Sequence, residues 1–141
     1  MAILHPEARK LLESDALVHL VTINKDGSPQ MSCVWVGLEG DEIVSGHMTP
    51  RQKLLNVERD PRVALSVEAE SYDTIGLREY LAVHGRARVE EGGAAELLQR
   101  LAHVYLGHEV TFPPPAYSHP GGYVLRITPE RIGGNGPWAG P

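Results

Sequence analysis

The sequence predicts a mainly β protein, an antiparallel barrel or sheet with short helices at its ends. Short β-branched or apolar segments follow one another with tight connections, and several of them alternate between apolar and polar residues. Segments with helical spacing are few, and they do not alternate with the strands as in a parallel, doubly wound sheet. These two observations favour antiparallel pairing between neighbouring strands.

The N-terminal part of the chain predicts a helix followed by a hairpin. "HPEARKLLES" places Pro6 near a helix start, which predicts a short amphipathic helix over residues 6–14. Residues 16–24 and 29–38 are β-branched apolar runs, and the "KDGS" between them contains an Asp-Gly pair. Because Asp-Gly is favoured in tight hairpin turns, these two runs predict a β-hairpin.

The middle of the chain predicts a strand, a helix and a second strand. "EIVSGHM" (42–48) follows a turn and predicts the first of these strands. The helix in the fifties should end before Pro61, because the residue that precedes a proline is pushed out of helical geometry. Residues 62–70 alternate strictly, as a half-buried strand does, and residues 71–79 are expected to form a loop.

The C-terminal part predicts two more strands around a helix. Residues 80–91 alternate between an apolar and a polar face, and Gly85 within them is a candidate for a bulge or bend. "AAELLQRLAHVYLG" has helical spacing with Gly107 as its candidate C-cap. The segment 109–121 is too rich in proline for regular structure, and residues 123–132 are the last predicted strand.

Composition predicts one soluble domain over residues 1–141. With 42% hydrophobic and 22% charged residues, no run approaches the length of a membrane span, and the N-terminus lacks signal architecture. A cytoplasmic location is therefore expected. The net charge of −5, from 13 Lys and Arg against 18 Asp and Glu, argues against a nucleic-acid binder that works by bulk electrostatics.

Cysteine and histidine give no sign of a metal site. Cys33 is the single cysteine, which excludes an internal disulfide and a Cys-rich metal site, and its strand-like surroundings predict a core position. The seven histidines show no metal-ligand spacing. Catalytic motifs such as G-x-S-x-G, Walker A and G-x-G-x-x-G are absent from the sequence, so an enzymatic activity would draw its chemistry from a bound cofactor.

The stretch "TPRQK" (49–53) is the strongest candidate site. Thr49 suits an N-cap and Pro50 the first helical position, which places Arg51 and Lys53 in the first turn. The helix dipole disfavours positive charge there, and a bound anion such as phosphate would offset it. The alternative is a surface helix with solvated basic residues, and the stretch alone does not decide. The small and polar "SGH" (45–47) that precedes it favours a site.

Four motifs occur together and in order: "TINKDGSPQMSCVWV", "SGHMTPRQKLLNVERDPRVALSV", "YLAVHGRARV" and "TPERIGGNGPW". In them the sequence resembles the pyridoxamine 5'-phosphate oxidase-like superfamily of FMN-binding split β-barrels. Within it, the "SPQMS" strand, the compact R-x-K motif and the "GNGPW" ending are more similar to the F-420-dependent flavin/deazaflavin oxidoreductases of the B class than to FMN binders. The resemblance covers most of residues 10–138 and implies a split antiparallel β-barrel with short helices at the barrel ends.

The resemblance also implies a homodimer of two split barrels, with two cofactor sites at the interface built from both chains. Arg51 and Lys53 match the basic pair that holds the cofactor phosphate in such proteins. The resemblance assigns further residues to the cofactor. Gln30, Met31, Ser32 and Val34 of the second hairpin strand lie beside the ring, and Ser45, Gly46, Thr49 and Pro50 lie around the phosphate turn. Tyr80 stands at a strand start that faces the ring from the partner side, and Trp138 lies in the tail that caps the site.

The implied function is an F-420-dependent reductase, which transfers a hydride from reduced F-420 to a small or medium unsaturated or quinone-like acceptor. An FMN-dependent oxidoreductase on the same barrel and a non-catalytic flavin or F-420 carrier are the alternatives. The substrate proton could come from solvent or from His47, which could equally be a structural neighbour of the phosphate turn. The substrate pocket is expected from residues 71–79, the segment 109–121 and the tail.

Overall fold

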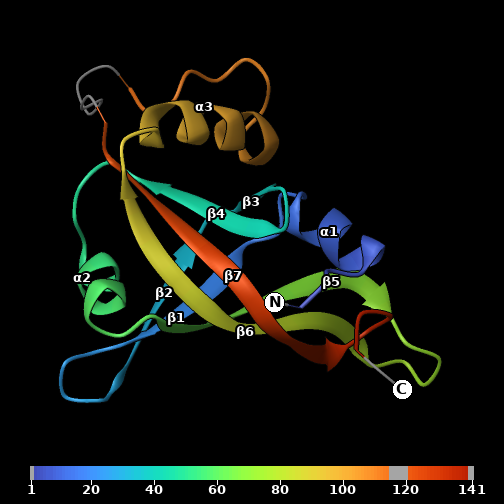
Figure 1. Cartoon of the computed structure of the whole chain (residues 1–141). Helices are drawn as coiled ribbons and strands as arrows, with labels where there is room; N and C mark the ends of the chain where they lie inside the picture. Colours follow the sequence, from blue (N-terminus) through green and yellow to red (C-terminus); the bar gives the residue numbers. More distant parts are fainter. Residues whose placement is uncertain (1, 115–120, 140–141) are drawn as a thin grey trace.

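The computed structural model describes residues 2–114 and 121–139. Within them seven strands form one antiparallel sheet in the order β2-β1-β5-β6-β7-β4-β3, which places β2 and β3 at its edges (Figure 1). The strands are β1 (Val18–Ile23), β2 (Pro29–Val34), β3 (Gly37–Glu39), β4 (Glu42–His47), β5 (Arg62–Tyr72), β6 (Arg78–Glu91) and β7 (Tyr123–Asn135). The helices are α1 (Pro6–Leu12), α2 (Gln52–Arg59) and α3 (Ala94–Tyr105).

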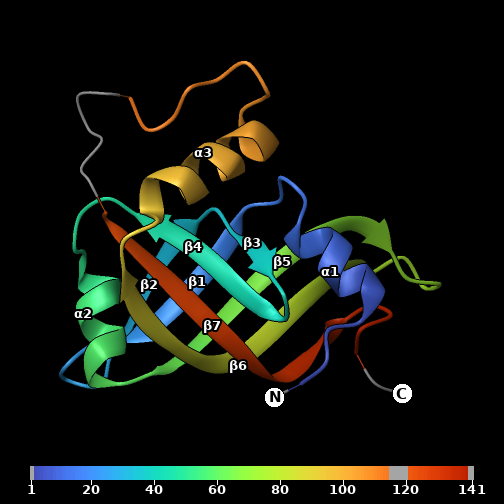
Figure 2. The same cartoon turned by 45° about the horizontal axis from the view of Figure 1, so that its top comes forward.

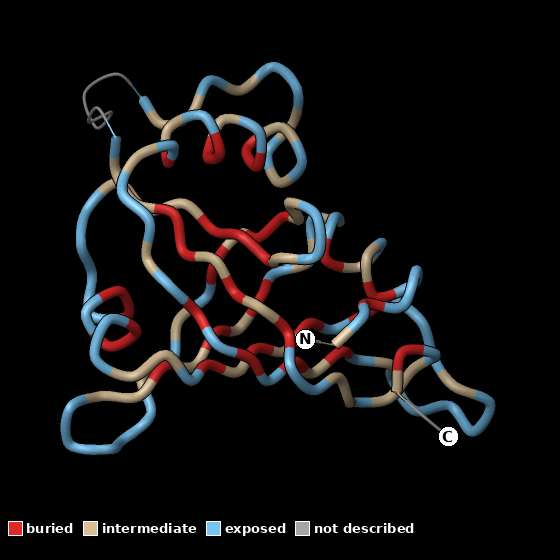
Figure 3. The backbone as a smooth tube through the Cα atoms, in the orientation of Figure 1, coloured by how far each residue is buried: buried red, intermediate tan, exposed pale blue. Residues whose placement is uncertain are grey.

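The sheet curves around its core, and the helices lie at its margins (Figure 2). Buried residues alternate along β1, β5 and β6, and they join α1 and α2 in one apolar cluster. A second, smaller cluster of Val44, Leu97, Leu101 and Val124 packs α3 against β4 and β7. Figure 3 shows the corresponding buried side of α3, which faces the sheet. None of the described helices is long and apolar enough to cross a membrane.

Gly85 confirms the predicted irregularity in β6. The register of β6 against β7 shifts between His84 and Gly85. A Cβ atom at Gly85 would lie 2.4 Å from the backbone oxygen of Thr128, so the two strands approach too closely there for any side chain. The shift lets β6 bend while its inward face stays apolar on both sides.

Two predicted boundaries were wrong. The run 29–38 is not one strand, because Val36 N–H donates to the Tyr105 hydroxyl (3.2 Å) and not to a neighbouring strand. The chain therefore turns between β2 and β3. The predicted loop 71–79 is confined to residues 73–77, because the Asp73 carboxylate accepts from the N–H groups of Ile75 (3.0 Å) and Leu77 (2.9 Å) and closes a tight hairpin.

The far ends of α3 and β7 also differ slightly from expectation. Leu106 is the C-cap of α3, one residue before the predicted cap Gly107, which follows it in the left-handed region with φ of 122°. The last strand continues past residue 132 to Asn135, since residues 132–135 pair with the start of β6. Both shifts lengthen regular structure or move it by a few residues without changing the topology.

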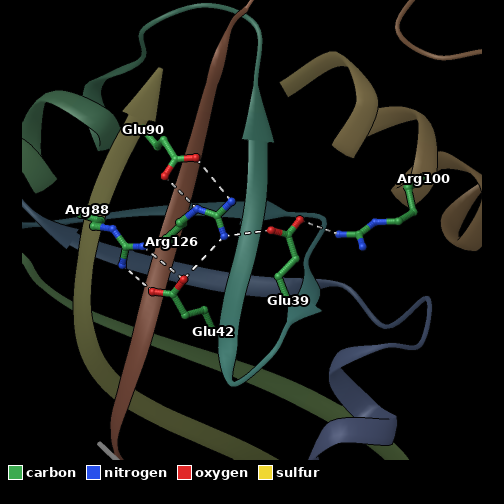
Figure 4. Close-up of polar contacts among 6 residues, drawn as sticks. All are labelled: Glu39, Glu42, Arg88, Glu90, Arg100 and Arg126. Atoms are coloured by element: carbon green, nitrogen blue, oxygen red, sulfur yellow. Dashed lines mark hydrogen bonds and ion pairs between the residues drawn. The ribbon is translucent and has the colours of Figure 1, made fainter. Parts of the chain in front are cut away.

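An ion-pair network ties α3 to the sheet (Figure 4). Arg126 of β7 reaches Glu39 (2.9 Å), Glu42 (3.5 Å) and Glu90 (3.2 Å), and Arg100 of α3 reaches Glu39 (3.1 Å). Arg88 also pairs with Glu42, and this hydrogen bond is the first cause of the lowered pKa of the Glu42 carboxyl. Exposed pairs each contribute little, but together they orient the helix that forms one wall of the candidate site.

A buried polar network holds α2 to the first hairpin. Asn56 of α2 is fully buried, and its amide donates to the Thr22 hydroxyl (3.0 Å) and to Asn24 Oδ1 (2.9 Å). The Thr22 hydroxyl in turn donates to Gln30 Oε1 (3.2 Å). Because every member has a partner, the network fixes the position of α2 on β1 and β2.

We expect Asn56→Leu to lower the free energy of unfolding by about 1–3 kcal/mol, because Asn24 and Thr22 then lose their donor in a buried place. Urea unfolding of the purified chain measures this. Leu55→Ala, at a neighbouring position of α2 that is exposed, is the control and should change the value by less than about 0.5 kcal/mol. Equal effects of the two changes would show that the network does not hold the helix.

Candidate cofactor site

A cavity of about 370 Å³ opens where the ends of β2 and β4 meet the start of α2. Its fourth side is formed by α3 and the segment that follows it. The cavity brings together the two predicted cations, Arg51 and Lys53, and the predicted residues Val34 and Gly46. Its other lining residues were not among the predicted site residues. Its lining is Cys33, Val34, Trp35, Gly46, His47, Arg51, Lys53, Leu98 and Phe112.

The helix at this site begins later than predicted. Arg51, not Thr49, is the N-cap residue, and its extended backbone (φ −117°, ψ 167°) prevents Pro50 from being helical. An arginine side chain has no acceptor, so the start of α2 lacks a side-chain cap, and its first turn contains no acidic residue. Thr49 and Pro50 are exposed and precede the helix. The free N–H groups of this turn are therefore open to an external anion.

Lys53 is the most unusual cation of the described chain, because it is only 9% exposed. Its Nζ has one long hydrogen bond, to the Ser32 hydroxyl at 3.4 Å. Burial, followed by the positive charge of Arg51, lowers the pKa of the Lys53 ammonium. In the described ranges 2–114 and 121–139 neither cation forms an ion pair with a carboxylate. Buried charges are ordinarily paired, so this arrangement suits an anionic ligand.

His47 is held neutral beside this pair. Burial lowers its pKa to about 4, and the charges of Lys53 and Arg51 add to the effect. Its Nε2 lies 2.8 Å from the hydroxyl of Ser45, which is itself buried. A ring with this pKa is neutral at neutral pH, and the contact with Ser45 gives His47 a structural place beside the phosphate turn.

The pKa of His47 predicts how stability depends on pH. The pKa of the His47 ring is about 4 in the folded chain and 6.5 in the unfolded chain, so between these pH values the unfolded chain binds more protons. The free energy of unfolding therefore falls as the pH is lowered through this window. Between pH 7 and pH 5 we expect the wild type to lose about 2 kcal/mol more than His47→Gln. Urea unfolding at pH 7, 6 and 5 measures this, and parallel curves for the two proteins would contradict it.

The second hairpin strand divides the predicted ring-lining residues between two faces. Gln30, Ser32 and Val34 point toward α2, whereas Met31 is 67% exposed on the opposite face. Within one chain the structure therefore does not bring Met31 together with the others. Cys33 is also exposed, and it lines the same cavity as Arg51 and Lys53, so its predicted core position was wrong. The reason is the two-residue period of a strand, which turns positions 31 and 33 outward at the edge of the sheet.

Tyr80 and Trp138 lie together at the opposite end of β6. The Trp138 indole N–H donates to the backbone oxygen of Tyr80 (3.0 Å), and Trp138 is buried in the main core. In Figure 1 this end, near the C-terminus, is far from α2. Within one chain, the structure therefore does not bring these two residues to the pocket of Arg51 and Lys53.

Gly46 and the α3 wall complete the site. A Cβ atom at Gly46 would lie 3.0 Å from Leu98 Cγ and 3.2 Å from the Ala94 backbone oxygen, so glycine lets α3 sit close to the end of β4. Phe112 lies in the segment 109–121 that was expected to contribute to a substrate pocket, but neither it nor Leu98 was singled out, because that region matched no motif. Among the described residues no group of three His, Cys, Asp or Glu side chains is placed to hold a metal ion.

The antiparallel sheet of seven strands with short helices at its margins defines a split β-barrel, and a cationic pocket lies where α2 begins. The sequence profile of the pyridoxamine 5'-phosphate oxidase family matches residues 4–135, so the chain belongs to this family. This confirms the predicted fold class and superfamily. A search of curated protein sequences gives no match.

Solved structures resemble the chain over most of its length. An F420 reductase is 28% identical with a TM-score of 0.71, and the match covers 89% of this chain and 94% of the reductase. A conserved hypothetical protein from Mycobacterium tuberculosis is 24% identical (TM-score 0.72, covering 96% and 86%). The heme storage protein HutZ from Vibrio cholerae is 16% identical (TM-score 0.63, covering 96% of both chains). The last two likenesses concern the fold alone.

Proposed function

We propose that the protein is an F-420-dependent oxidoreductase of the flavin/deazaflavin B class. The observation that carries the proposal is the start of α2, where a buried Lys53 and an adjacent Arg51 face a cavity without a carboxylate partner among the described residues. The uncapped helix end adds N–H donors at the same place. A phosphate group supplies the negative charge and the acceptor oxygens that these groups lack.

The similarity to an F420 reductase favours F-420 over other phosphate-bearing cofactors. In this proposal Arg51, Lys53 and the first N–H groups of α2 hold the phosphate. Ser32 orients the Lys53 ammonium, as its 3.4 Å contact indicates. Ser45, Gly46 and Thr49 lie near the same turn and would approach the ribityl chain. The ring would lie along Gln30, Ser32 and Val34.

When bound, reduced F-420 would supply a hydride, which an unsaturated or quinone-like acceptor takes up together with a proton. The chain's own part is to bind and orient the two molecules and to exclude water between them. Because His47 is neutral, we assign the proton to solvent and name no catalytic residue. The acceptor itself stays open.

A homodimer is part of the proposal. The outer face of β1 and β2 carries Val21, Ile23 and Met31, and Met31 is largely exposed. A second copy that covers this face would place Met31 at the interface, and in this proposal the partner also contributes Tyr80, which is 44% exposed. The cytoplasmic location expected from the sequence stays a prediction.

The same pocket fits the phosphate of FMN, which makes an FMN-dependent oxidoreductase the second candidate. A carrier that binds the cofactor without turnover is the third, and the neutral state of His47, the proton donor that the sequence offered, favours it. All three candidates use the same phosphate site. The first two differ in the cofactor that they bind, and the carrier differs from both because it does not turn over a substrate.

Titration of the purified full-length chain with F-420, FMN and FAD tests the proposal. We expect saturable quenching of F-420 fluorescence at micromolar concentration, weaker binding of FMN, and oxidation of reduced F-420 when a quinone such as menadione is added. A protein that is yellow with FMN after expression and does not bind F-420 would overturn the choice of cofactor. Binding of F-420 without oxidation by any acceptor would favour the carrier.

A further inference from the structure

An apolar wall shares the candidate site with its cations. Leu98 of α3 and Phe112 line the cavity that contains Arg51 and Lys53. They also line an adjoining cavity of about 540 Å³, together with Pro113 and Pro114. Among the described residues that line these two cavities none is Asp or Glu. The site is therefore cationic on one side and apolar on the other.

The wall is held in place from two directions. The Phe112 ring packs on Trp35 at a centroid distance of 5.2 Å, and Trp35 stacks on Tyr105 at 5.3 Å. The Tyr105 hydroxyl donates to the backbone oxygen of Ala16 (2.9 Å), which ties this aromatic stack to the start of β1. Aromatic packing of this kind fixes the plane of the Phe112 ring relative to the sheet.

Gln99 fixes the backbone on which Phe112 is carried. Its amide oxygen accepts from Phe112 N–H (2.9 Å), and its amide nitrogen donates to the Val110 backbone oxygen (2.8 Å). One side chain therefore holds a three-residue piece of an otherwise irregular segment against α3. The double contact keeps the backbone of residues 110–112 in one place relative to α3, and with it the Phe112 side of the cavity.

We infer that Leu98 and Phe112 form an acceptor subsite beside the phosphate-binding pair, and that Gln99 is its positioning residue. The ligand is a flat, apolar molecule or ring that carries no positive charge. A cationic ligand would find no carboxylate in the lining of either cavity and would meet Arg51, which lines both, whereas a neutral or anionic ring meets the apolar surface of Leu98 and Phe112. This inference rests on the proposed function, because it assigns the acceptor and not the cofactor to the wall.

The test compares Phe112→Ala with Thr111→Ala, a neighbouring exposed position that lines neither cavity. With menadione as acceptor we expect the KM of Phe112→Ala to rise at least about tenfold, and the Kd of F-420 to stay within about twofold of the wild type. Thr111→Ala should behave like the wild type. An unchanged KM, or a weakened F-420 affinity without a change in KM, would overturn the inference.

Gln99→Leu separates positioning from direct contact. The substitution keeps a similar volume but removes both hydrogen bonds, so we expect a higher KM for menadione with the kcat changed much less. Gln99→Glu keeps the oxygen that accepts from Phe112 N–H and should restore part of the affinity. If both variants match the wild type in KM, Gln99 does not position the wall.

A second experiment tests the subsite without F-420. The aromatic anion 1-anilinonaphthalene-8-sulfonate should bind the full-length chain saturably with a rise in fluorescence, and Phe112→Ala should weaken this binding at least about tenfold while Thr111→Ala does not. The cationic dye thioflavin T should bind much more weakly. If F-420 does not bind but this pattern appears, the proposed cofactor fails and the subsite stands. Equal binding of both dyes, or no effect of Phe112→Ala, would overturn the subsite.

Discussion

Replacing Arg51 and Lys53 together by alanine is expected to weaken F-420 binding by several kcal/mol. Each charge-assisted hydrogen bond contributes roughly 1.5–3 kcal/mol, so the loss of both cations corresponds to about a hundredfold to ten-thousandfold rise in Kd. The effect should be large because Lys53 is buried and faces the cavity without a competing carboxylate among the described residues. Fluorescence titration of F-420 measures it.

A matched control is Lys25→Ala with Arg131→Ala, which removes two exposed positive charges elsewhere. This variant should bind F-420 within about twofold of the wild type, since exposed charges act only weakly over such distances. The Arg51 and Lys53 variant should also be at least as stable as the wild type, because it removes a buried cation. An unchanged F-420 affinity would mean that the start of α2 is a solvated surface.

Trp138→Ala is expected to lower the free energy of unfolding by about 3–5 kcal/mol. Trp138 is buried in the main core, and its indole N–H donates to the Tyr80 backbone oxygen, so the change opens a cavity and leaves an acceptor without its partner. Urea unfolding measures this. Trp138→Phe retains an aromatic ring and should cost less than half as much. A loss below about 1 kcal/mol for Trp138→Ala would show that the tail does not close the core.

Much of the fold followed from the sequence because strand periodicity and turn residues are local properties. The alternation along β5 and β6, the Asp-Gly turn and the helix stop before Pro61 each depend on residues within a few positions. Boundaries failed where a particular side-chain contact decides, whether its partner is distant or local. The division of 29–38 depends on Tyr105, which is far along the chain, and the closure of the 73–77 turn depends on side-chain contacts of Asp73.

The candidate site could be predicted in part for the same reason. Arg51 and Lys53 stood out because their charge conflicts with the start of a helix, which is a local conflict. The displaced N-cap, the burial of Lys53 and the neutral state of His47 come from packing, and no pattern of neighbouring residues reports them. Phe112 was not singled out within the expected pocket segment 109–121, because its role is set by contacts to Trp35 and Gln99, which only the folded chain brings together.

The central claim, that the start of α2 binds a cofactor phosphate, is tested most directly from the side of the ligand. Wild-type protein is titrated with F-420 and with the same deazaflavin ring and ribityl chain that lacks the phosphate and everything beyond it. We expect F-420 to bind at least about a hundredfold more tightly, and the difference to shrink below about tenfold in the Arg51→Ala, Lys53→Ala double variant. Equal affinity of the wild type for both ligands would contradict the claim.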